Sequence, residues 1–222
     1  MLAQIFAQDR KLVRFLFSLY LLPVLFLFVV VIATAQMGVS LAMLTRDPAS
    51  IAKIHPFIGV VSNLGVLLWT ASATICLFSW ALFRHRLNEM RFATFLLCSG
   101  LLTTLLLLDD FFLLHDAIFP HYFGVNEKVA FLGYGGLIIG WMVIFRKCIR
   151  RTEYLILLTA LVFFGLSLFI DVFQHPIQSV IGNARIFFED GFKLLGIVGW
   201  FGYFLRCCLV QLGDKTGTDL KG

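Results

Sequence analysis

Charged residues are scarce in this chain. Asp, Glu, Lys and Arg make up 14% of its 222 residues, whereas a water-soluble domain carries about a quarter. Hydrophobic residues make up 60% of the chain, and they gather in runs of about 18 residues or more. These runs exclude an ordinary soluble domain, and no nucleic-acid-binding module is recognisable. The composition predicts an all-α, polytopic membrane protein whose main partner is the lipid bilayer.

The sequence also lacks cysteine patterns that hold metals or form disulfides. None of its cysteines forms a C-x-x-C pair, and none is expected in an outward-facing loop: Cys76, Cys98, Cys148, Cys207 and Cys208. We therefore expect neither a disulfide framework nor a cysteine-held metal.

Six apolar segments are long enough to cross a bilayer, and the whole chain, 1–222, is expected to form one integral membrane domain. The expected spans are 12–36, 57–83, 92–114, 127–145, 153–175 and 184–209. Asp47 followed by Pro48 is typical of a helix start, which predicts an interfacial helix over 48–55. Asn126 and Thr152 are expected to cap the fourth and fifth spans.

The basic residues predict that both termini are cytoplasmic, as in a multi-pass protein of a prokaryotic inner membrane. With the N-terminus inside, five of the 18 basic residues remain outside: Arg46, Lys53, Lys128, Arg185 and Lys193. Tryptophan precedes arginine at the inner end of each even-numbered span: Trp80 and Arg84, Trp141 and Arg146, Trp200 and Arg206. This bias and the aromatic belt agree with the positive-inside rule.

Acidic residues and histidines are expected mainly at the opposite, extracytoplasmic face. This group contains Asp47, Asp109, Asp110, Asp116, Glu127, Asp171, Glu189 and Asp190, with His55, His115, His121 and His175. Ionisable groups at the edge of a hydrophobic span are costly, so they mark this face as the candidate functional region.

A short internal repeat relates two helical hairpins, spans three-four and spans five-six. Each contains D-x-F, then a histidine and a glutamate, then Gly-Trp ahead of an arginine. Two such hairpins are expected to pack about a pseudo-symmetry axis. The repeat would place Asp110 and His115 opposite Asp171 and His175.

Imidazole and carboxylate groups together suit zinc, iron or manganese. The candidate metal ligands are Asp110, His115, Asp171, His175 and Asp116. Asp171 and His175 share one helix face, with Ser167 one turn further in. If the metal serves hydrolysis, the candidate catalytic residues are Asp110, Asp171, Ser167 and Glu189.

Several of these residues also have simpler interpretations. Asp109, Asp116, His121 and Asp190 fit solvated interfacial positions. Glu189 and Lys193 are four residues apart in the order that favours an ion pair. Hydroxyl groups inside spans often bond their own helix backbone, as expected for Thr70, Thr74 and Thr103. Five glycines are expected to allow close helix approach: Gly136, Gly140, Gly196, Gly199 and Gly202.

Two known families share part of this pattern. Ser167, Asp171 and His175 form S-x3-D-x3-H, which is similar to the donor set of alkaline ceramidases and adiponectin receptors, seven-span hydrolases that hold zinc with three histidines. This chain has six expected spans and no H-x3-H. Cation diffusion facilitators resemble it in span number and use H-x3-D, here reversed. They also carry a cytoplasmic domain that this chain lacks, so neither resemblance assigns residue roles.

The first hypothesis is a divalent-metal-dependent hydrolase that acts on a lipid at the extracytoplasmic face. One alternative is a non-catalytic subunit of a larger membrane complex, with other subunits or further copies of the chain as partners. Another is a small carrier of metal ions or protons. A haem held between His115 and His175 is a further alternative.

Overall fold

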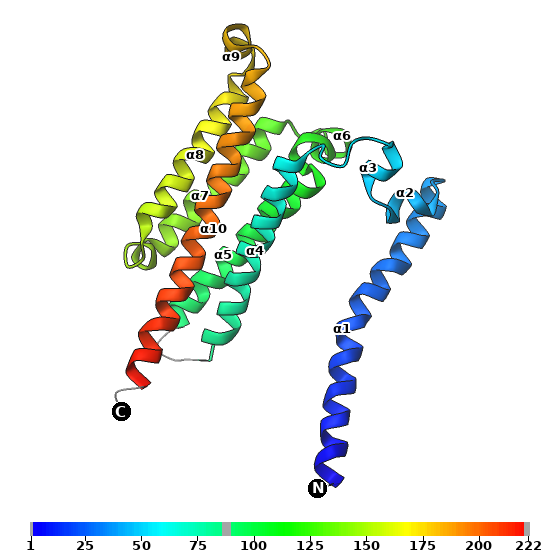
Figure 1. Cartoon of the computed structure of the whole chain (residues 1–222), viewed down its shortest axis with the longest axis vertical. Coiled ribbons are helices and arrows are strands. Elements are labelled where there is room, and N and C mark those ends of the chain that lie inside the picture. Colours follow the sequence, from blue (N-terminus) through cyan, green and yellow to red (C-terminus); the bar gives the residue numbers. More distant parts are fainter. Residues whose placement is uncertain (1, 86–89, 220–222) are drawn as a thin grey trace. The chain divides into compact units, whose positions relative to one another are not determined.

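The computed structural model of the chain describes residues 2–85 and 90–219, with side chains over 12–85 and 90–213. All regular elements in these ranges are helices (Figure 1). Six of them are long and apolar enough to cross a membrane: Leu12–Met37, Val60–Phe83, Met90–Phe112, Glu127–Ile149, Tyr154–Val172 and Ala184–Gly213. The predicted all-α class with six spans is confirmed at this level. The protein is a multi-pass membrane protein whose apolar helix surfaces contact lipid.

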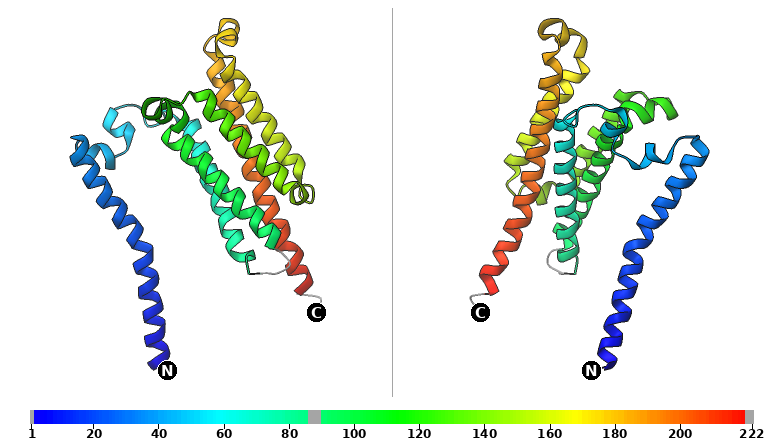
Figure 2. Two further views of the ribbon diagram at one scale, coloured as in Figure 1. Left: turned by 180° about the vertical axis from the view of Figure 1, so that it is seen from behind. Right: turned by 45° about the vertical axis from the view of Figure 1, so that its right-hand side comes forward.

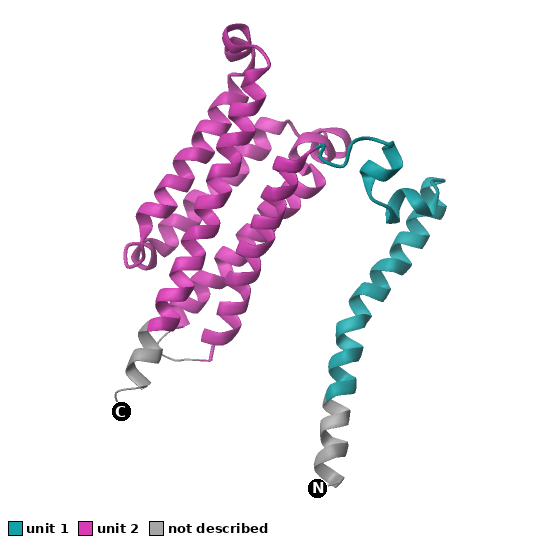
Figure 3. Ribbon diagram, viewed as in Figure 1, with its two compact units in different colours: residues 1–58 teal, residues 59–222 magenta. Residues whose placement is uncertain are grey.

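The chain divides into two compact units, residues 1–58 and 59–222 (Figure 3). The first contains α1 (Leu2–Met37), α2 (Leu41–Thr45) and α3 (Pro48–Ala52). The Asp47 carboxylate caps α3 by accepting a 3.0 Å hydrogen bond from the Ser50 amide, as predicted. The helix ends at Ala52, short of the expected 55, because Lys53 adopts a left-handed φ of 52°.

The second unit contains the remaining helices: α4 (Val60–Phe83), α5 (Met90–Phe112), the π-helix η2 (Leu114–Ile118), α6 (Phe119–Phe123), α7 (Glu127–Ile149), α8 (Tyr154–Val172), α9 (Gln174–Ile181) and α10 (Ala184–Asp219). Helix α10 packs against both α8 and α4, α4 packs against α5, and α5 packs against α7 (Figure 2). The five long helices form one bundle around an aromatic core.

Two tryptophans in this core donate hydrogen bonds to hydroxyls on α5. The indole nitrogen of Trp141 lies 3.1 Å from Ser99 Oγ, and that of Trp200 lies 3.0 Å from Thr103 Oγ1. Both hydroxyls donate to the carbonyl one turn earlier, so each buried polar group is paired. The predicted backbone bonding of Thr103 and Thr70 is confirmed.

Close helix approach occurs where α8 meets α10. A Cβ on Gly199 would lie 3.0 Å from Ala160 Cβ, and one on Gly196 would lie 2.6 Å from the Phe164 ring. At Gly136, Gly140 and Gly202 a Cβ would meet nothing within 4 Å in the described residues. The glycine prediction therefore holds for two positions on α10 and is wrong for the other three.

The helix ends at the expected outer face differ from the expected bounds. Helix α5 ends at Phe112, and α8 ends at Val172, with the separate helix α9 starting at Gln174. Asn126 caps α7 as predicted, by accepting from the Lys128 amide. The expected Thr152 cap is wrong, because its hydroxyl donates to the Ile149 carbonyl and also contacts the Tyr203 hydroxyl.

Candidate functional site

Asp109 lies in the last turn of α5 and is 6% exposed. Its Oδ1 accepts from the His115 backbone amide at 3.1 Å and from the Tyr134 hydroxyl at 2.7 Å. Its Oδ2 lies 2.6 Å from His115 Nδ1. A buried carboxylate is stabilised when several donors converge on it, as they do here. Asp109 is therefore the residue around which this end of the bundle is arranged.

A distorted turn brings His115 back toward Asp109. Leu113 adopts a left-handed φ of 53°, and the next residues form a π-helix over Leu114–Ile118. A leucine in this conformation costs about 1–3 kcal/mol, and such strain is found most often at functional sites. Short π-helices are enriched at such sites as well. The hydrogen bonds to Asp109 offset the strain, and they are the physical reason that the turn persists.

His115 lies between two carboxylates and is 8% exposed. Its Nδ1 contacts Asp109, its Nε2 is 3.2 Å from Asp116 Oδ1, and its ring packs at 4.9 Å from the Phe131 ring centroid. Burial alone would lower the pKa of His115, but hydrogen bonds and charge from Asp109 and Asp116 outweigh it and raise the pKa to about 9. The same interactions, with the His115 hydrogen bond first, lower the pKa of Asp116.

Glu127 completes a group of three potential metal ligands with His115 and Asp116. One ligand atom from each lies within 4.8 Å of the other two. Glu127 is the first residue of α7 and is positioned by the Asn126 cap. Ligands around a tetrahedral ion with bonds near 2.1 Å lie about 3.4 Å apart. Small side-chain rotations would therefore close this group around an ion.

Asp171, on α8, is half-buried, and its charge interacts with those of His115, Asp116, Glu127 and Arg185. Asp171 was predicted as a site residue and lies outside the three-ligand group, but its charge interacts with all three members of that group.

The other predicted site residues lie elsewhere. Asp110 is buried, and its Oδ1 lies 2.5 Å from Lys193 Nζ. Glu189 pairs with Arg185, so the expected Glu189–Lys193 ion pair is wrong. Ser167 is buried within α8, and His175 is exposed on α9. The structure thus brings His115 and Asp116 together and leaves Asp110 and His175 outside their group.

The sequence did not place Asp109, Glu127, Tyr134 or Lys193 among the candidate ligands or catalytic residues. It assigned Asp109 to a solvated interface and Lys193 to an ion pair with Glu189. A signal for two of these four residues was present, because Glu127, Phe131 and Tyr134 follow the i, i+4, i+7 spacing of one helix face. That face meets His115 through Phe131 and Asp109 through Tyr134. Asp109 was interpreted as interfacial because the bend after α5, which buries it, has no glycine or asparagine to indicate it.

A family model, described as a domain of unknown function (DUF8692), matches residues 24–207. The chain belongs to the DUF8692 family. The match covers residues 24–58 of the first unit, residues 59–207 of the second, and every residue of the site described above. No curated protein and no solved structure matches the chain. Membership in DUF8692 therefore supplies no activity, and the chemistry must be argued from the site.

Proposed function

We propose that this DUF8692 protein is a membrane-embedded, divalent-metal-dependent hydrolase that acts on a lipid at the extracytoplasmic face. The observation that carries the proposal is the contact between Asp109 and Nδ1 of His115. Histidines that ligate metals almost always donate their other ring N–H to a carboxylate or carbonyl. Here that contact leaves Nε2 directed toward Asp116, with Glu127 close by.

The proposed ligands are His115 Nε2 and the carboxylates of Asp116 and Glu127. One imidazole nitrogen and two carboxylate oxygens are donor types that zinc, manganese and iron all accept. The ion would supply Lewis acidity and a bound water of lowered pKa. Three protein ligands leave a coordination position for that water or for substrate.

The surrounding residues have separate roles in this proposal. Asp109 fixes the orientation of the imidazole, and the Tyr134 hydroxyl holds Asp109 in place. Asp171 is the proposed general base. Its half-buried carboxylate interacts electrostatically with His115 and Asp116, and among the described residues it is not a member of the three-ligand group. It would accept a proton from the attacking water.

A carrier of metal ions or protons is less well supported. The buried polar side chains of α4 and α5 below the site are the hydroxyls of Ser72, Ser79, Ser99 and Thr103. In the described part of the bundle, Asp109, Asp110 and His115 are the only buried Asp, Glu, His, Lys or Arg residues. A transport pathway needs ionisable or hydrated positions across the membrane, and the tryptophans fill this region.

The test is metal content of the full chain, purified in detergent and measured by elemental analysis. We expect about one equivalent of a divalent metal in wild type, and loss of most of it in His115→Ala and Glu127→Gln. His175→Ala is the matched control, since His175 is exposed on the neighbouring helix α9 and should leave metal content unchanged. Wild-type protein without stoichiometric metal after reconstitution with zinc, manganese and iron would overturn the proposal.

Activity separates a hydrolase from the subunit alternative. Metal-loaded protein should release a water-soluble product from lipid vesicles, and Asp171→Asn should lose that activity while retaining metal. Full metal occupancy with no turnover of any phospholipid or acylated lipid would favour a non-catalytic subunit. The proposal would then be wrong in its reaction and right only in its metal.

A further inference from the structure

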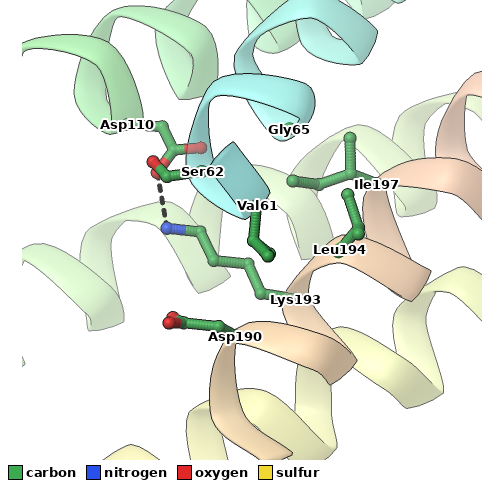
Figure 4. A pocket seen from close by; sticks show the side chains of 8 residues that line it. All are labelled: Val61, Ser62, Gly65, Asp110, Asp190, Lys193, Leu194 and Ile197. Carbon is green, nitrogen blue, oxygen red and sulfur yellow. Dashed lines mark hydrogen bonds and ion pairs between the residues drawn. The ribbon is translucent and has the colours of Figure 1, made fainter. Parts of the chain in front are cut away.

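A small pocket lies between α4, α5 and α10 on the second unit (Figure 4). Its volume is about 40 Å³, and its lining is Val61, Ser62, Gly65, Asp110, Asp190, Lys193, Leu194 and Ile197. A water needs roughly 10–15 Å³ of such space, so the enclosed part of this pocket has room for one small charged group, and a larger molecule would extend out of its open side. Polar ends gather on one side and the aliphatic side chains on the other.

Lys193 provides a positive charge with donors to spare. Its ammonium is 2.5 Å from Asp110 Oδ1, which is itself buried at the end of α5. One carboxylate oxygen occupies one of the three donors of an ammonium group. The Lys193 side chain remains 40% exposed. Asp110 therefore anchors Lys193 and leaves it able to bind an acceptor that enters the pocket.

Asp190 provides a negative charge beside this cation. It lies three residues before Lys193 on α10, so the two share a helix face. Asp190 makes no hydrogen bond or salt bridge with a described side chain, although its charge interacts with that of Lys193. Figure 4 shows the ammonium with Asp110 on one side and Asp190 on the other.

This charge pattern selects among possible occupants. A simple anion would be repelled by the carboxylates of Asp110 and Asp190, and a simple cation would be repelled by the ammonium of Lys193. A zwitterion with adjacent negative and positive groups satisfies both, because its anionic group can accept from Lys193 while its cationic group donates to Asp190.

The apolar side of the pocket indicates that the occupant comes from the bilayer. Val61 is 42% exposed, and Val60 and Leu64 on the same helix are 54% and 46% exposed. A Cβ on Gly65 would lie 3.1 Å from Ile197 Cδ1 and 3.9 Å from Asp110 Oδ2. A side chain larger than glycine would therefore fill the wall where the polar and apolar sides meet.

We propose that this pocket binds the headgroup of a zwitterionic, primary-amine phospholipid, with its phosphate at Lys193 and its ammonium at Asp190. The inference rests on the proposed function and names the substrate class of that site. The two sites share one end of α5, because Asp109 contacts His115 and the next residue, Asp110, contacts Lys193.

Lipid retention by the full chain tests this inference without metal or turnover. The protein is purified in detergent with chelator, exchanged into equimolar mixtures of phosphatidylethanolamine and phosphatidylglycerol, and analysed by native mass spectrometry. These lipids share the phosphate and differ in the amine. We expect retention of phosphatidylethanolamine to exceed that of phosphatidylglycerol about tenfold, the effect of one charge-assisted hydrogen bond.

Asp190→Asn decides the proposal, because Asp190 is exposed and makes no hydrogen bond or salt bridge with a described side chain, so we expect its replacement to leave the fold intact. It should bring the retention ratio of the two lipids to about one, while Lys53→Gln, at an exposed lysine of the first unit, keeps the wild-type ratio. An Asp190→Asn ratio equal to that of wild type, or no preference in wild type, would overturn the inference.

Two further variants locate the lipid. Lys193→Gln should reduce retention of both lipids, and Gly65→Val should exclude both by filling the pocket wall. Free phosphoethanolamine added in excess should compete only weakly, since it lacks the acyl chains. Chelated protein that retains the lipid while metal-loaded protein shows no hydrolysis would uphold this inference and reject the proposed function. Hydrolysis without headgroup preference would do the reverse.

Discussion

His115 is held at two points by the carboxylate of Asp109. Asp109 Oδ1 accepts a 3.1 Å hydrogen bond from the His115 backbone amide, and Asp109 Oδ2 lies 2.6 Å from His115 Nδ1. The two contacts fix both the main chain and the ring, so neither the position nor the rotation of the imidazole is left to solvent. A ligand held in this way loses little conformational freedom when it binds a metal.

Replacing Asp109 should weaken metal binding without removing a ligand. We expect Asp109→Asn to lower metal affinity about 10–100-fold, the usual effect of losing a carboxylate that orients a metal-bound histidine. Competition with a fluorescent chelator measures the change. Tyr134→Phe is the graded control, since it removes one hydrogen bond from Asp109 and should cost less. Equal affinity in Asp109→Asn and wild type would show that this contact does not orient a ligand.

The stability of the metal-free protein should depend on pH through His115. Its pKa is raised from 6.5 to about 9 in the folded chain. The imidazolium therefore stabilises the fold fully below about pH 6.5, and this contribution is lost as pH rises through about 9. Thermal unfolding in chelator should show a lower midpoint at pH 9.5 than at pH 6. His115→Gln should remove most of this difference, and a full difference in that variant would assign it to other groups.

Metal binding should release a proton near neutral pH. His115 is protonated at pH 7 because its pKa is about 9, whereas a metal ligand must be neutral. Apparent affinity should thus rise about tenfold per pH unit until the pH approaches that pKa. Calorimetric titration in buffers of different ionisation enthalpy counts the protons released. Release of none at pH 7 would mean that His115 Nε2 does not join the ligand set.

Ser99 supplies the hydrogen-bond acceptor for a buried tryptophan. Ser99→Ala leaves the Trp141 indole N–H without its partner, and an unsatisfied buried donor costs about 1–3 kcal/mol. Thermal unfolding in detergent should show this loss of stability. Thr159→Ala is the matched control, because the exposed Thr159 hydroxyl only donates to its own helix at Leu155. Equal midpoints for the two variants would contradict the prediction.

Gly199 lies where the backbone of α10 approaches that of α8 closely. A Cβ there would be 3.0 Å from Ala160 Cβ and 3.2 Å from its Cα. Since backbone cannot swing aside, Gly199→Ala should destabilise the bundle by about 1–3 kcal/mol. Gly202→Ala, one turn along the same helix, meets nothing within 4 Å and should be neutral or slightly stabilising. Unfolding in a denaturing detergent series compares them, and equal stability of Gly199→Ala and wild type would count against the packing argument.

Local patterns predicted the fold well, because a bilayer demands continuous apolar helices. The helix caps at Asp47 and Asn126 could also be predicted, because each side chain bonds a backbone amide within three residues of itself. Long-range pairing was not readable in this way. Glu189 and Lys193 have favourable local spacing, yet the packing of the bundle brings Lys193 to Asp110 on α5.

The sequence predicted the region of the candidate site from its acidic residues and histidines, but it did not predict which of these side chains contact one another. The predicted Asp110 and His115 are five residues apart, and their side chains have different partners because the chain bends at Leu113. Leucine rarely adopts a positive φ, so the residue type at position 113 gave no indication of the bend. Hydropathy and spacing therefore identified the region, while the bend decided which carboxylate meets the imidazole.

The π-helix over Leu114–Ile118 has an evolutionary consequence. Its hydrogen bonds span one residue more than those of an α-helix, so this turn contains one residue in excess of ordinary helical winding. A DUF8692 gene that lost a single codon here would still encode the same spans with the same hydropathy. Its His115 counterpart would nevertheless rotate away from Asp109. Members with and without the site would then be separated by a one-residue gap in an alignment, with every ligand still present in the sequence.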